Sequence, residues 1–192
     1  MVCDTMTPSQ EILNAATELL WVAAVLVQIY MRIASNNACA RLSVMGVALA
    51  IHAPCSINLH IHKAMRLADA RDSFEGRLDQ SSILVVSIAY MYVLFGWTPY
   101  SLLLMSVLAS LLPRFWTRSS MGDDRAVYIA VAAIANVAPL VIEHGVRTTP
   151  MVGWLALGGA LFGQNRVLRG YGHALFHLTM FPYHMELLRY VC

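Results

Sequence analysis

Two histidines four residues apart, His173 and His177, lie near the C-terminus in the string Gly172-His173-Ala174-Leu175-Phe176-His177. On a helix this spacing places both imidazoles on one face, about 6 Å apart at Cβ, which suits two ligands of one metal ion. The same spacing also suits two histidines that form hydrogen bonds with neighbouring membrane helices. The pair alone therefore leaves metal binding and interhelical hydrogen bonding open.

A second four-residue step joins Ser56 to His60, and a lone carboxylate, Asp79, follows nineteen residues later. Ser56 and His60 would share one helical face. Each of these residues also has an ordinary structural interpretation. The serine hydroxyl can bond back to its own helix, the histidine can reach the membrane interface, and the aspartate can cap a helix N-terminus.

The composition predicts the kind of element that positions these residues. The chain has 192 residues, of which 58% are hydrophobic and 12% charged, and its mean hydropathy is +0.60. Soluble domains carry about 25% charged residues, so an integral membrane protein is expected. A formal net charge of +2 gives no basis for a nucleic-acid-binding surface. The four cysteines form no CxxC pair, which indicates neither a disulfide framework nor a zinc ribbon.

Apolar stretches divide the chain into seven segments separated by turn-forming residues. Their predicted bounds are 12–34, 42–62, 80–97, 99–113, 126–142, 151–165 and 172–191. A membrane-spanning helix needs about 20 residues, so the fourth and sixth segments are short. Ala38-Cys39-Ala40 resembles a signal-peptide cleavage site, but no basic region precedes the first segment, which we therefore interpret as a span. We predict a single domain, 1–192, that is an all-α bundle of seven transmembrane helices.

This topology brings the polar residues together. With seven spans, the second ends on the membrane side where the third and seventh begin, so Ser56, His60, Asp79, His173 and His177 lie at one depth. Three imidazoles are the ligand set of a catalytic zinc site, in which a fourth position holds water. The sequence therefore predicts an intramembrane zinc ion bound by His60, His173 and His177.

The distribution of basic residues predicts the orientation. Nine of the thirteen fall on the side of the N-terminus: Lys63, Arg66, Arg71, Arg77, Arg114, Arg118, Arg125, Arg166 and Arg169. The other four are Arg32, Arg41, Arg147 and Arg189. Because short cytoplasmic loops carry the excess of Lys and Arg, we expect a multi-pass membrane protein with a cytosolic N-terminus.

The order of these motifs resembles a known superfamily. Ser-x3-His ending the second helix, Asp79 opening the third and His-x3-His opening the seventh is similar to the CREST superfamily. This superfamily of seven-helix membrane proteins includes alkaline ceramidases, progestin and adipoQ receptors, haemolysin-III-type proteins and GPI-remodelling lipases. Glu11-x-x-Asn14-x-x-Thr17 resembles the opening of the receptor branch, although Glu18 stands where that branch usually has histidine. Gln80 also departs from the tyrosine that commonly follows the aspartate. The resemblance implies that the zinc ligands are His60, His173 and His177.

A zinc ion in such a site would lower the pKa of its bound water to about 7 and supply a nucleophile. Asp79 is then expected to act as general acid and base, and Ser56 to donate a hydrogen bond to the water or to the developing oxyanion. The implied reaction is hydrolysis of an amide or ester bond of a membrane lipid. Ceramide-like amides, phospholipids and acylated lipid anchors all fit.

Other polar residues carry separate expectations. We expect His62 to face the headgroups and His184 to hydrogen-bond between helices. His52 lies two turns before His60, where it could line the same cavity from below. Glu18, within the first span, is expected to line the cavity or to pair with a histidine. Two competing functions remain: a receptor or scaffold that keeps a structural zinc, and a transporter or proton relay that uses the histidines without metal.

Overall fold

The computed structural model describes residues 6–35, 39–65, 73–117 and 124–191. Within these residues all regular secondary structure is helical, which confirms the all-α class. Seven α-helices follow in order: α1 (Pro8–Ala34), α2 (Ala40–Ala64), α3 (Phe74–Phe95), α4 (Pro99–Thr117), α5 (Asp124–His144), α6 (Thr149–Gly163) and α7 (Gly172–Leu187). Two short 3-10 helices, η1 (Gly145–Thr148) and η2 (Leu188–Tyr190), follow α5 and α7.

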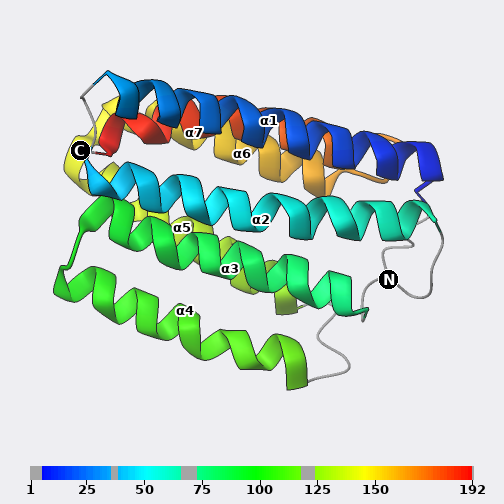
Figure 1. The fold of residues 1–192 in the computed structure, drawn as a ribbon, viewed down its shortest axis with the longest axis horizontal. Helices are drawn as coiled ribbons and strands as arrows, with labels where there is room; N and C mark the ends of the chain where they lie inside the picture. Colours follow the sequence, from blue (N-terminus) through cyan, green and yellow to red (C-terminus); the bar gives the residue numbers. More distant parts are fainter. Residues whose placement is uncertain (1–5, 36–38, 66–72, 118–123, 192) are drawn as a thin grey trace.

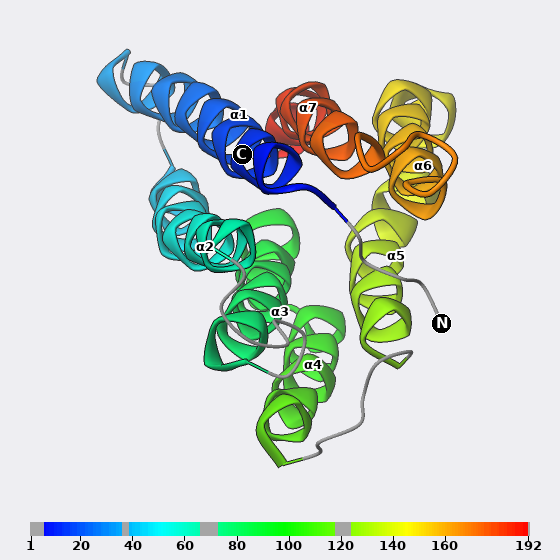
Figure 2. The same ribbon diagram turned by 90° about the vertical axis from the view of Figure 1, so that its right-hand side faces the viewer.

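Successive helices run in opposite directions along the bundle (Figure 1). Viewed from the end, α1, α2, α3 and α4 form one wall, and α7 and α6 lie on the other side of α1 (Figure 2). α1 packs against both α2 and α7, and α3 packs against α2, α4 and α5. The end of α2 and the starts of α1, α3 and α7 therefore lie at one end of the bundle, on the right in Figure 1.

Several helices have the length and composition of membrane spans. α1, α2, α3 and the segment Val127–Gly163, which joins most of α5 to α6, are each long and apolar enough to cross a bilayer. Large apolar side chains are also exposed on the outer surface, for example Leu20 at 62% and Ile142 at 86%. Such a surface is typical of a protein whose solvent is lipid, so the chain is a membrane protein.

The helix ends extend beyond the predicted apolar segments. α1 begins at Pro8 and not at residue 12, because Thr7 and Gln10 form a reciprocal capping box. α3 begins at Phe74 and not at residue 80, because the Ser73 side chain accepts a hydrogen bond from the Gly76 amide at 3.1 Å. Hydropathy marks only the part of a helix that suits the bilayer, whereas capping residues set its ends. Asp79 consequently lies in the second turn of α3, and its interpretation as a helix cap is wrong.

Some sequence expectations fall outside the described residues, including the charges of Arg66, Arg71 and Arg118. Cys39, just before α2, is disulfide-bonded. Sequence spacing does not predict this bond, because pairing depends on where cysteines meet in space.

An apolar core holds the helices around the site in register. Fully buried Val25, Leu49, Val93 and Leu187 join α1, α2, α3 and α7 in one cluster. α6 approaches α7 closely at Gly158, where a Cβ would lie 2.5 Å from the Thr179 hydroxyl. These contacts fix α7 between α1 and α6.

Candidate metal centre

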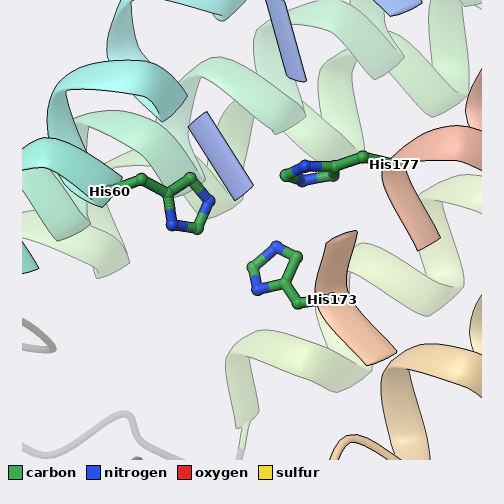
Figure 3. A group of neighbouring side chains, drawn as sticks. All are labelled: His60, His173 and His177. Carbon is green, nitrogen blue, oxygen red and sulfur yellow. The ribbon is translucent and has the colours of Figure 1, made fainter. Parts of the chain in front are cut away.

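Three histidines from two helices meet at the end of the bundle where α2 ends and α7 begins. His60 lies in the last turn and a half of α2, and His173 and His177 lie in the first two turns of α7. One ligand atom from each lies within 4.8 Å of the other two. Their ring centroids are 4.6 to 5.6 Å apart, and the rings face one another across a common space (Figure 3). The structure thus brings together the three histidines that the sequence singles out.

The hydrogen bonds of two of these rings determine which nitrogen is free. His60 Nδ1 lies 2.7 Å from Glu11 Oε2, and His177 Nδ1 lies 3.0 Å from the carbonyl oxygen of Asn14. A carbonyl oxygen can only accept, and a carboxylate accepts as well, so both Nδ1 atoms carry the proton. In the neutral rings each Nε2 therefore presents a lone pair, as a metal-ligating histidine requires.

The donor set fits a cation. His177 Nε2 lies 3.4 Å from Glu18 Oε2. The lone pair of a neutral ring and a carboxylate oxygen repel each other at this distance, and a cation beside them would relieve the repulsion. Nitrogens bound to one tetrahedral zinc lie about 3.4 Å apart for bonds of about 2.1 Å. The ligand atoms of the three histidines lie within 4.8 Å of one another, so each pair would approach by at most about 1.4 Å to reach that distance. His60 and His177 are only 1% and 3% exposed, so the site could hold a metal ion away from bulk water.

A tight contact fixes the first turn of α7, which carries two of the three histidines. A Cβ at Gly172 would clash with the carbonyl oxygen of Leu161, at the end of α6. The His173 amide donates to Asn165 Oδ1 at 3.1 Å. The glycine and the asparagine therefore set where His173 begins the helix.

The two residues predicted to act in catalysis lie at the same end of the bundle. Ser56 is buried, one helical turn before His60. Asp79 is buried and close enough to His60 and His52 to interact with both electrostatically. Its Oδ1 has no hydrogen-bond partner among the described residues. Asp79 is not one of the three mutually close ligands, which leaves its carboxylate available for another role.

Glu18 connects the three-histidine group to the region of Asp79. Its Oε1 lies 3.3 Å from His52 Nε2, and its Oε2 lies 3.4 Å from His177 Nε2. His52 Nδ1 in turn lies 2.8 Å from the Ser82 hydroxyl, which donates to the Asp79 carbonyl oxygen at 2.5 Å. Glu18 thus pairs with histidines, one of the two arrangements expected from the sequence.

Two further histidines, His62 and His184, have structural surroundings. His62 Nδ1 lies 3.8 Å from Glu75 Oε1, outside the three-histidine group. His184 Nδ1 donates to the carbonyl oxygen of Met180 in its own helix at 2.7 Å, and its ring stacks on Trp21. The expected interhelical hydrogen bond of His184 is therefore wrong, because the ring folds back over the preceding turn and Trp21 covers it.

Residues of α1 that the sequence analysis gave no role also contact the histidines. Glu11 accepts from His60, and the Thr17 hydroxyl lies 3.2 Å from His177 Nδ1. Asn14 Nδ2 donates to Glu11 Oε2 at 3.3 Å. The sequence does contain a pattern that indicates this polar face of α1. Glu11, Asn14 and Glu18 recur every three or four residues and form one polar stripe on a helix that is otherwise largely apolar.

Comparisons of the chain with protein-family models, with curated proteins and with solved structures found no match. The interpretation of the site therefore depends on its own geometry: three imidazoles, two of them buried, that could hold a metal ion, with carboxylates close by.

Proposed function

We propose that this chain is a zinc-dependent intramembrane hydrolase that cleaves an amide or ester bond of a lipid. The observation that carries the proposal is the buried group of His60, His173 and His177 within a bundle of apolar helices. The resemblance to the CREST superfamily supports the same conclusion.

The proposal includes seven membrane crossings and a cytosolic N-terminus. Alternating helix directions (Figure 1) support an odd number of crossings. The excess of basic residues on the side of the histidine group supports a cytosolic location for that side. The disulfide of Cys39 lies between α1 and α2, at the opposite end of the bundle. Since disulfides persist in oxidising compartments, it supports a luminal or extracellular location for that end.

Zinc is the metal that the ligands favour, because imidazole nitrogens suit it and three protein ligands are typical of its catalytic sites. When bound, zinc supplies a Lewis acid and an activated water. Asp79 then accepts a proton at its carboxylate and returns it to the leaving amine or alcohol. The Ser56 hydroxyl donates a hydrogen bond to the oxyanion that develops on the substrate carbonyl. The apolar outer surface gives the acyl chain a path from the lipid.

A receptor or scaffold with a structural metal is the second candidate. The burial of His60 and His177 favours it, because such a site ties α2 to α7 with little contact to water. Removal of the metal separates the two functions. A structural site loses stability together with its metal, whereas a catalytic site loses turnover first.

The test combines metal analysis with lipid analysis. We expect one zinc per purified chain. Lipid extracts from cells that express the wild type or the His173→Ala variant are compared by mass spectrometry, and only the wild type is expected to deplete one lipid class and accumulate its cleaved acyl product. Identical lipid profiles, together with a large fall in melting temperature on chelation, would favour the structural site over the hydrolase.

A further inference from the structure

We infer that α1 provides the second shell of the metal centre and that Glu11 is the positioning residue that holds His60. This inference rests on the metal site of the proposed function, but not on hydrolysis. The sequence analysis gave Glu11 no role of its own, and the inference comes from the contacts of α1.

The Glu11–His60 contact has the geometry of a second-shell hydrogen bond. The two atoms are 2.7 Å apart, and the side chains are 5% and 1% exposed. A carboxylate buried this far is costly unless it is paired, and its described partners are the ring of His60 and the amide of Asn14. A metal-ligating histidine commonly donates its second N–H to a carboxylate, which fixes the tautomer and orients the ring. Glu11 supplies that carboxylate for His60.

The two anchored histidines differ in what holds them. Only the Glu11 side chain accepts from His60 Nδ1 among the described residues, whereas His177 Nδ1 is shared between the Asn14 carbonyl oxygen and the Thr17 hydroxyl. A side-chain substitution cannot remove a backbone carbonyl. His177 therefore keeps an anchor when Thr17 is changed, whereas His60 loses its anchor when Glu11 is changed.

The start of α1 is itself fixed against α7. Thr7 and Gln10 cap the helix reciprocally, and Gln10 Nε2 donates to the carbonyl oxygen of Arg169 at 2.5 Å, just before α7 begins. A Cβ at Gly170 would lie 2.7 Å from Gln10 Oε1, so the chain passes close to α1 here. The turn of α1 that carries Glu11 is thus held in register with the helix that carries the other two histidines.

The test measures zinc affinity of the purified full-length protein in detergent by competition with a chelator. We expect Glu11→Leu to weaken zinc binding by about 10- to 100-fold, the usual effect of losing a second-shell partner. Glu11→Gln keeps a neutral hydrogen-bond acceptor, so its zinc affinity is expected to lie between those of the wild type and Glu11→Leu. Thr17→Val, which leaves the Asn14 carbonyl in place, is expected to bind nearly as tightly as the wild type. Glu186→Gln, at the far end of α7, is the control for loss of a carboxylate.

A second readout separates positioning from general support of the fold. Cobalt replaces zinc, and its visible absorption reports ligand number and geometry. We expect the Glu11→Gln spectrum to shift while the melting temperature of its metal-free form stays near that of the wild type. If Glu11→Leu does not fold, the Glu11→Gln affinity and spectrum decide the question.

The outcomes distinguish this inference from the proposed function. Wild-type protein that binds no zinc would overturn both. A different result would overturn only the positioning role of Glu11. In that case the wild-type protein binds zinc, and Glu11→Gln and any folded Glu11→Leu match it in zinc affinity and cobalt spectrum. The predicted graded loss of zinc without lipid hydrolysis would overturn the hydrolase and leave the inference standing.

Discussion

Gly172→Ala offers a way to disturb the proposed metal centre without changing a proposed ligand. The new Cβ would clash with the Leu161 carbonyl oxygen and lie 2.8 Å from Asn165 Cα. Ordinary contact begins at 3.4 Å, so the start of α7 must move by at least 3.4 − 2.8, about 0.6 Å, relative to Asn165. Backbone atoms form this obstacle, and they cannot rotate away as a flexible side chain would.

The displaced helix start carries His173 as its next residue. Because functional sites depend on ligand positions held within about 0.5 Å, we expect Gly172→Ala to weaken zinc binding by about 10- to 100-fold, as for lost second-shell support. Overpacking is also expected to lower the free energy of unfolding by about 1–3 kcal/mol. The assays are chelator competition for zinc and thermal unfolding in detergent.

Gly159→Ala is the matched control, because a Cβ there meets nothing within 4 Å and the residue lies within α6. We expect this control to keep zinc affinity and to be neutral or slightly stabilising, since alanine favours helix over glycine. If Gly172→Ala bound zinc as tightly as Gly159→Ala, then the contact between α6 and α7 would not set the position of His173, and our explanation of the site's geometry would be refuted.

Three further predictions concern individual side chains. His173→Ala should abolish zinc retention measured by metal analysis while His62→Ala should not, and equal loss in both would mean that the helix faces are misassigned. Asp79→Asn should keep its zinc but stop hydrolysis of a labelled lipid, because the amide cannot accept and return a proton; unchanged turnover would remove Asp79 from the chemistry. Ser56→Ala should lower turnover by about 10²-fold or more if its hydroxyl stabilises the oxyanion, and full activity with the same lipid would exclude that role.

The meeting of His60 with the pair on α7 could be predicted from sequence because it depends on two robust features. Four-residue spacing fixes which side chains share a helical face. The alternation of apolar segments fixes which helix ends lie together, even when boundaries are wrong by several residues. The predicted start of α3 is six residues too late, so Asp79 lies in the second turn of the helix and not at its end. It still lies at the same end of the bundle as the histidine group.

The contribution of α1 could not be predicted in the same way. The anchor of His177 is the carbonyl oxygen of Asn14, and a backbone atom leaves no trace in the residue type. Glu11 and Glu18 are visible in the sequence, but the helix face on which they meet their partners depends on how α1 packs between α2 and α7. His184 shows the same limit, since its bond to Met180 and its stacking on Trp21 depend on side-chain conformation.

The charges around the site give a physical reason for a cation. Glu11 and Glu18 are buried, 4% and 1% exposed, and both contact the rings of proposed ligands. Neutral imidazoles cannot balance two carboxylates in a medium where an unpaired charge is expensive. A cation between the rings would offset this negative charge, and it would be stabilised in turn by the carboxylates of α1 rather than by water. On this argument the carboxylates of α1 serve both the orientation of the ligands and the charge of the metal.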